Sequence, residues 1–78
     1  MDAHKPLTIG LFGFGVVGEG LYKVLQQTPS LKATIKKVCI KNPGKQRPAP
    51  AALFTTDRYE LLNDPDINVI VEVINESE

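Results

Sequence analysis

The stretch "LTIGLFGFGVVG", residues 7–18, decides how this chain folds. Its first half, residues 7–12, is a mostly apolar and β-prone run, which is typical of a strand buried on both faces. Its second half places Gly13, Gly15 and Gly18 in the pattern G-x-G-x-x-G. Between a strand and a helix, this pattern predicts a tight turn whose main chain can approach a pyrophosphate.

A helix is expected directly after the glycines. Apolar residues at helical spacing predict it over residues 16–27, ending before Pro29; they are Val17, Leu21, Val24 and Leu25. The free N–H groups and the positive end of this helix would face the phosphates of a dinucleotide. The candidate binding loop therefore consists of Gly13, Phe14, Gly15, Val16, Val17 and Gly18. The alternative is a strand-to-helix turn that binds no ligand.

Each glycine of the motif has its own expected role. Gly13 allows the sharp turn, Gly15 lets the backbone approach a pyrophosphate, and Gly18 lets the helix pack close to the sheet. Gly20 fits none of these roles, and we expect it only to relieve packing.

Three more strands and a short helix are expected downstream. The strands are predicted at residues 34–40, 53–55 and 69–74. Residues 43–50 hold three prolines and predict an exposed loop. Asp57 and Glu60 resemble a capping box that starts a helix through Leu62.

This order of elements predicts an α/β fold. Right-handed crossovers would arrange the four strands as 3-2-1-4 in a mostly parallel sheet, which is a partial Rossmann fold. The whole chain, residues 1–78, is interpreted as one nucleotide-binding domain, expected to be incomplete as the N-terminal part of a longer enzyme.

Composition excludes several classes of partner. Hydrophobic residues make up 42% of the chain, which allows a packed core, and nine basic residues balance nine acidic ones. A zero net charge argues against a nucleic-acid partner, and no apolar run approaches the roughly 20 residues that cross a membrane. A single cysteine and the lack of a leader sequence favour a soluble, cytoplasmic protein.

The acid that usually selects NAD is missing from its expected place. A carboxylate about 20 residues after the glycines would bind the adenosine ribose, but no Asp or Glu occurs from Gly20 to Thr56. The end of the second strand instead offers Lys41, Lys45 and Arg47. A cation there would pair with the 2′-phosphate of NADP, so we expect NADP to be preferred over NAD. The alternative is that these are solvated loop charges.

No catalytic residue or metal site is expected in this chain. His4 is interpreted as a surface residue, Cys39 as a small buried hydrophobe, and Glu72 as a partly buried structural acid. Asp64 and Asp66 flank a proline in a turn, and without a third ligand they do not predict a metal site.

Two longer segments resemble a known family. "IGLFGFGVVGEGL" is similar to the opening of homoserine dehydrogenases, and "FTTDRYELLNDPDINVIVEVI" looks like the same family's short helix, D-P-x-I turn and following strand. The resemblance implies reduction of aspartate 4-semialdehyde to homoserine with NADPH or NADH, in threonine and methionine biosynthesis. It carries over the glycine loop, Lys41 as a 2′-phosphate contact and Asn75 as a residue beside the nicotinamide half. Asn75 and Glu76 stand where the family usually has two glycines.

The family's catalytic lysine and aspartate belong to a downstream substrate domain. The resemblance therefore implies that the isolated chain binds cofactor without turnover. We also expect the protein to be a homo-oligomer. Two alternatives stay open: the cofactor domain of a glucose-fructose oxidoreductase-like dehydrogenase, and a non-catalytic nucleotide-sensing module.

Overall fold

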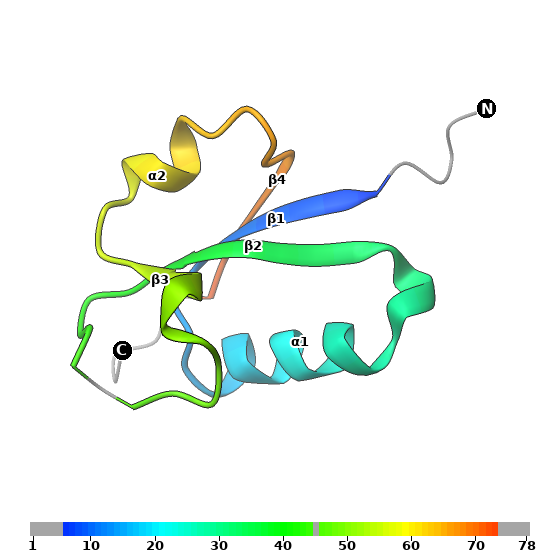
Figure 1. Ribbon diagram of the computed structural model, residues 1–78, viewed down its shortest axis with the longest axis horizontal. Helices are drawn as coiled ribbons and strands as arrows, with labels where there is room; N and C mark the ends of the chain where they lie inside the picture. Colours follow the sequence, from blue (N-terminus) through cyan, green and yellow to red (C-terminus); the bar gives the residue numbers. More distant parts are fainter. Residues whose placement is uncertain (1–5, 45, 74–78) are drawn as a thin grey trace.

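The computed structural model describes residues 6–44 and 46–73, and within them the chain forms a four-stranded parallel sheet. The strand order is β3-β2-β1-β4, as predicted. The strands are β1 (Leu7–Phe12), β2 (Ala33–Cys39), β3 (Phe54–Thr55) and β4 (Val69–Glu72). Helices α1 (Val16–Gln27) and α2 (Tyr59–Leu62) lie on opposite faces of the sheet (Figure 1). Short 3-10 helices span Pro29–Leu31 and Ala51–Leu53.

The predicted bounds are correct for β1 and α1 and differ slightly elsewhere. Strand β2 begins and ends one residue earlier than predicted, and β3 begins one residue later. Strand β4 ends at Glu72, although the main-chain N–H of Val73 still donates to the Phe12 carbonyl at 2.8 Å. Ile74, the predicted last residue of this strand, lies outside the described residues.

The core lies between α1 and the sheet. Its buried side chains come from β1, the glycine loop and β2: Ile9, Leu11, Phe14, Ile35, Val38 and Ile40. Helix α1 contributes Leu21, Tyr22 and Leu25, which share a face with Gly18 at spacings of three, four and seven residues. The predicted stripe is thus wrong at two positions, because Val17 and Val24 lie beside that face and are 65% and 51% exposed.

An irregularity in β2 places Lys36 over the loop that leads to β4. Ile9 pairs with Ile35 but Gly10 pairs with Lys37, so Lys36 is an extra residue in the register. Its Nζ lies 2.7 Å from Asp64 Oδ2 and 3.2 Å from Asp66 Oδ2.

Asp64 and Asp66, in the loop before β4, both form salt bridges with Lys36. The Lys36 side chain lowers the pKa of Asp64, and the two carboxylates raise the pKa of Lys36. The main-chain N–H of Asp66 also donates to Asp64 Oδ1 at 2.8 Å. Within the described part of the chain, no group of three or more metal-ligating side chains occurs.

Asn68, which directly precedes β4, forms hydrogen bonds with the start of β1 and the residue before it. The main-chain N–H of Thr8 donates to Asn68 Oδ1 at 2.9 Å, and Asn68 Nδ2 donates to the Pro6 carbonyl at 3.2 Å. The main-chain N–H of Asn68 donates in turn to the Thr8 carbonyl at 2.9 Å. One amide side chain therefore joins segments that are 60 residues apart in sequence.

Two expectations about loops are corrected. The segment 43–50 does pack in part, since Arg47 and Ala49 are half-buried. Before α2, Asp57 Oδ1 accepts from the main-chain N–H of Tyr59 at 2.9 Å, whereas the Glu60 carboxylate lies 3.9 Å from Lys37 Nζ. The helix therefore starts with an aspartate turn rather than a reciprocal capping box.

None of the helices among the described residues is long and apolar enough to cross a membrane.

Candidate functional site

The glycine turn lies at the carboxyl edge of the sheet, where β1 passes into α1. Gly13 has φ of 98°, a conformation that side chains other than glycine rarely adopt, and its N–H donates to the Cys39 carbonyl at 3.0 Å. Gly15 precedes the helix with φ of −69°, which any residue can adopt. The first helical bond runs from the Glu19 N–H to the Gly15 carbonyl at 2.8 Å. The earlier N–H groups of α1 have no acceptor within the helix, and Gly15 has no side chain to cap them.

The third glycine allows the helix to approach the turn. A Cβ atom at Gly18 would lie 2.9 Å from the Gly13 carbonyl oxygen and 3.3 Å from a methyl of Val73. The expected packing role of Gly18 is therefore confirmed. For Gly20 the expectation is wrong, because a Cβ atom there would meet nothing within 4 Å.

The side chains of the loop divide between core and solvent. Phe14 is 4% exposed, and its ring makes edge contacts with Tyr22 and Phe54 at centroid distances of 5.8 and 5.1 Å. Val16 and Val17 are 83% and 65% exposed. The Phe14 side chain thus packs in the core, and only the main chain of Phe14 is left for a ligand. The side chains of Val16 and Val17 are exposed at the N-terminal end of α1.

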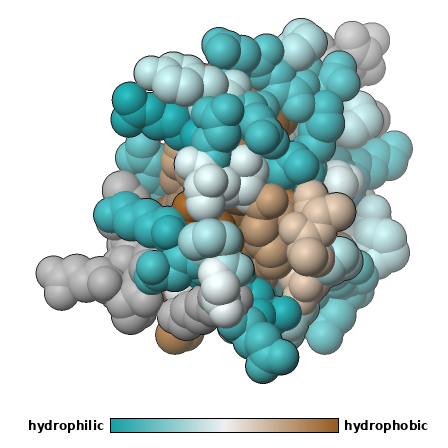
Figure 2. Space-filling model, turned by 60° about the vertical axis from the view of Figure 1, so that its left-hand side comes forward, coloured by the Kyte–Doolittle hydropathy of each residue, from teal (hydrophilic) through white to brown (hydrophobic). Residues whose placement is uncertain are grey.

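Apolar surface is exposed at the centre of the side of the molecule shown in Figure 2, with hydrophilic side chains around it. Concave apolar surface with a few polar groups is typical of small-molecule sites. Two cavities open near the carboxyl edge, and we name each after one cation that lines it, Arg47 or Lys41.

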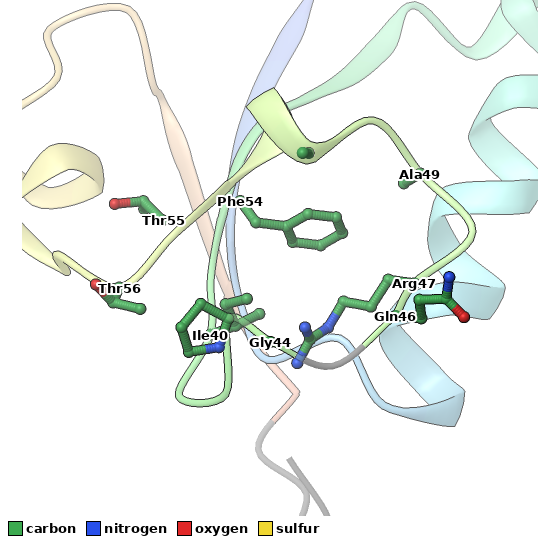
Figure 3. Close-up of a pocket in the computed structure, with 10 residues that line it drawn as sticks. Ile40, Gly44, Gln46, Arg47, Ala49, Phe54, Thr55 and Thr56 are labelled. Carbon is green, nitrogen blue, oxygen red and sulfur yellow. The ribbon is translucent and has the colours of Figure 1, made fainter.

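The Arg47 cavity has a volume of about 590 Å³ and is lined in part by Ile40, Ala49 and Phe54, which also belong to or pack against the core. The Arg47 guanidinium lies 5.4 Å from the centre of the Phe54 ring, and its Nη1 donates to the Asn42 carbonyl at 2.8 Å. Figure 3 shows the Phe54 ring and the Arg47 side chain projecting into this cavity, while Thr55 points to the other side of its strand. Arg47 is therefore held in place by a stacking contact and a hydrogen bond.

The Lys41 cavity has a volume of about 570 Å³, and Tyr59 and Leu62 of α2 form part of its wall. It opens beside the glycine turn, and it is lined by Phe12, Gly13, Cys39, Ile40, Lys41, Arg58, Tyr59, Leu62, Ile70 and Glu72. Lys41 and Arg47, grouped by sequence reasoning as one cluster, thus line two different cavities that share Ile40. Lys45, Asn75 and His4 lie outside the described residues.

Two titratable groups of the Lys41 cavity were assigned structural roles from the sequence. Cys39 is half-buried, and burial raises the pKa of its thiol, with Asp57 adding to the effect and Arg58 opposing it. A protonated, half-buried thiol fits the expected packing role. Glu72 was expected to be partly buried, but it is exposed and lines the cavity, because alternate residues of β4 point away from α1.

Sequence reasoning did not single out Arg58 and Tyr59. The Arg58 guanidinium lies 5.1 Å from the centre of the Tyr59 ring, and its Nη2 donates to the Tyr59 hydroxyl at 3.3 Å. Their position shortly after the end of β3 could have indicated a place in the site. Loops at the carboxyl ends of parallel strands line the ligand-binding crevice of open α/β sheets.

The site combines helix N–H donors, three cations and an apolar crevice. N–H groups at a helix start suit a pyrophosphate, the cations suit further anionic groups, and apolar walls suit a flat ring. The residues present therefore fit a dinucleotide that crosses the glycine turn.

Comparison with known proteins also indicates a dinucleotide-binding domain. Residues 13–78 match the family described as "Homoserine dehydrogenase, NAD binding domain". The homoserine dehydrogenase of Bacillus subtilis is 37% identical over 79 aligned positions, which cover 90% of this chain, and that of Synechocystis is 38% identical over 73, which cover 85%. The crystal structure of S. aureus homoserine dehydrogenase at pH 8.5 superposes with a TM-score of 0.73 at 30% identity over 94% of this chain.

The chain spans only a fraction of these relatives. It covers 18% of the Bacillus subtilis protein, 17% of the Synechocystis protein and 21% of the S. aureus chain. Since the family match extends over most of this sequence and includes the glycine turn, the chain belongs to the NAD-binding domain family of homoserine dehydrogenases.

Proposed function

We propose that this chain is the dinucleotide-binding part of a homoserine dehydrogenase. The whole enzyme would reduce aspartate 4-semialdehyde to homoserine, and the bound dinucleotide would supply the hydride. We assign no catalytic residue to residues 1–78, so the chain alone is expected to bind cofactor without turnover. The whole enzyme is proposed to be a cytoplasmic homo-oligomer.

The observation that carries the proposal is the geometry of the glycine turn. Gly13 turns the chain at the carboxyl end of a central strand, and Gly18 brings the start of α1 against that turn. This places the first N–H groups of α1 at the edge of a parallel sheet, where ligands of this fold class bind.

The proposed cofactor contacts follow from this geometry. Residues 13–18 would hold the pyrophosphate through the main chain, and Lys41 would face the adenosine end from the end of β2. Asn75 is proposed to lie beside the nicotinamide half on the strength of the family resemblance, and it lies outside the described residues. The lack of an acid in the sequence around Lys41, from Gly20 to Thr56, supports a preference for NADP over NAD.

Gly15 provides the test of the binding loop. Its φ of −69° does not itself require glycine, so we expect a side chain there to leave the fold intact but to displace a pyrophosphate. We expect Gly15→Val to weaken NADPH binding at least tenfold, measured by fluorescence titration, with circular dichroism unchanged. Gly20→Ala is the matched control and should bind as the wild type does, because its Cβ meets nothing. Full affinity in a folded Gly15→Val variant would contradict the proposed site.

A further inference from the structure

Two consecutive lysines of β2 lie on the same face of the sheet. In a regular strand, successive side chains alternate between the two faces, so residues three apart point to opposite faces. Ile35 and Val38 are three apart, yet both belong to the core on the α1 face. The extra residue in the register, Lys36, accounts for this, because it leaves Lys36 and Lys37 together on the α2 face.

The two lysines contact α2 and the loop that follows it. Lys36 Nζ lies 2.7 Å from Asp64 Oδ2, in the loop after the helix. Lys37 Nζ lies 3.9 Å from Glu60 Oε1, within the helix, and donates to the Ala52 carbonyl at 3.1 Å. The closer contact is therefore the one that Lys36 makes with the loop after α2.

We infer that the extra residue in β2 is a positioning device for α2. It directs Lys36 and Lys37 to the two ends of this helix, and their ion pairs hold the helix where it forms one wall of the Lys41 cavity. Tyr59 and Leu62 of α2 belong to that wall. The consequence for cofactor binding rests on the proposed function, whereas the positioning of α2 does not.

Helix α2 depends on outside contacts for its position. It has four residues, which form a single turn that is too short to be stable by itself. Its buried residue, Leu61, packs on β1 at Gly10, where a Cβ atom would lie 3.1 Å from a Leu61 methyl. This central contact fixes how far the helix lies from the sheet, and contacts at both ends fix its orientation.

The ion pairs are suited to setting a position rather than to adding much stability. Their side chains are partly exposed, and partly exposed pairs contribute little to the free energy of unfolding. We therefore expect the loss of these pairs to change the orientation of α2 more than the stability of the chain.

The pKa of the Cys39 thiol depends on where α2 lies. Burial raises this pKa, Asp57 and Glu60 add to the rise, and Arg58 opposes it. These three charged groups lie in α2 or directly before it. The other charged groups that line the cavity are Lys41 and Glu72. A helix that turns away from the sheet would expose the thiol and lower its pKa.

The test measures the thiol pKa in the folded chain without cofactor. Because the chain has a single cysteine, an isotope label on the cysteine Cβ gives one NMR signal for the folded state, separate from that of the unfolded state. This signal would be titrated with pH in the wild type, Lys36→Met, Lys36→Arg and Asp64→Asn. The control is Lys23→Met, which removes a partly exposed ion pair with Glu19 on α1.

We expect Lys36→Met and Asp64→Asn both to lower the thiol pKa, whereas Lys36→Arg and the control Lys23→Met should leave it unchanged. A direct effect of charge at a distance would have opposite signs in the two variants. Loss of the Lys36 charge would raise the thiol pKa, and loss of the Asp64 charge would lower it. Opposite signs, or no shift in either variant, would overturn the positioning role.

Titrations with NADPH and NADH connect the position of α2 with cofactor binding. Lys36→Met and Asp64→Asn should each weaken the binding of both cofactors about threefold, with an unchanged ratio of the two dissociation constants. Full affinity in variants whose thiol pKa is lowered would overturn the role of α2 as a wall of the cofactor site. A wild-type chain that binds neither cofactor would overturn the proposed function, while the thiol titration would still decide how α2 is held.

Discussion

A Cβ atom at Gly18 would lie only 2.9 Å from the carbonyl oxygen of Gly13. The first and third glycines of the motif are therefore coupled: one makes the turn, and the other allows α1 to pack on the main chain of that turn. This contact belongs to the fold, whereas the need for glycine at position 15 is attributed to the ligand.

We expect opposite effects on stability from two alanine substitutions in the same helix. Gly18→Ala should destabilise the chain by about 1–3 kcal/mol, because main-chain atoms of the turn must move. Gly20→Ala should stabilise it by about 0.5–1 kcal/mol, because alanine favours a helix and meets no neighbour. Urea denaturation of both variants provides the measurement. A neutral Gly18→Ala would show that α1 is free to shift away from the turn.

Charge reversal at Lys41 tests the cofactor preference. A carboxylate there would repel a 2′-phosphate and accept from a ribose hydroxyl, so Lys41→Asp should shift selectivity toward NADH. We expect the wild type to prefer NADPH about tenfold, with a smaller preference at high salt. Paired titrations of the two cofactors measure this shift. Equal affinities in the wild type, or unchanged selectivity in the variant, would identify Lys41 as a solvated loop charge.

The stability contributed by Lys36 and Asp64 depends on pH at both ends of the scale. The pKa of Asp64 is lowered from 3.8, so its contribution is present above that pH and is lost as pH falls through the lower folded-state value. The pKa of Lys36 is raised from 10.5, so its contribution is present below that pH and is lost as pH rises through the higher folded-state value.

Asparagine substitutions at Asp64 and Asp66 test how the stability depends on pH in the acidic range. Asp64→Asn should be less stable than the wild type at pH 7, and the difference should shrink as pH falls below 3.8. Asp66→Asn should have a smaller effect, because Asp66 is more exposed and lies farther from Lys36. Denaturation midpoints across this range measure the difference. A gap between wild type and Asp64→Asn that does not vary with pH would refute the linkage.

The rate at which the Cys39 thiol reacts can show whether a ligand occupies the Lys41 cavity. Because burial raises its pKa, alkylation by iodoacetamide at pH 8 should be slower in the folded chain than in urea. NADPH should slow it further if the cofactor occupies the cavity that Cys39 lines. Mass spectrometry of timed samples follows the reaction. Rates that do not respond to saturating NADPH would place the cofactor elsewhere.

Strand β4 forms an edge of the described sheet, and Ile70 on it is 43% exposed. Edge strands with apolar side chains pair with other chains, so we expect concentration-dependent association of the isolated chain. Ile70→Lys should reduce it, since a charge on an edge opposes pairing. Sedimentation velocity at several concentrations measures the effect. A stable wild-type monomer at high concentration would contradict this expectation.

Local patterns in the sequence predicted the elements well and their contacts less well. The bounds of β1 and α1 follow from apolar residues, glycines and Pro29, which act on neighbouring residues. Val17 and Val24 fit a helical stripe equally well, and only the close approach at Gly18 decides which face is buried.

The side chains of the candidate site depend on longer-range contacts. Arg58 follows the end of β3, which was a local signal, but no local pattern shows that it lines the same cavity as Lys41. The same holds for Asn68, whose partners are about 60 residues away in sequence.

The attachment of β4 to β1 also affects the order in which the chain folds. Residues 7–39 hold β1, α1 and β2 and can pair early, whereas the Thr8 to Asn68 contact closes a loop of about 60 residues, at an entropic cost that grows with the logarithm of its length. During synthesis, β4 emerges after the other three strands and completes the crevice beside Gly13. The residues that line the Lys41 cavity therefore come together only after β4 has docked, so a bound cofactor would stabilise that step of folding.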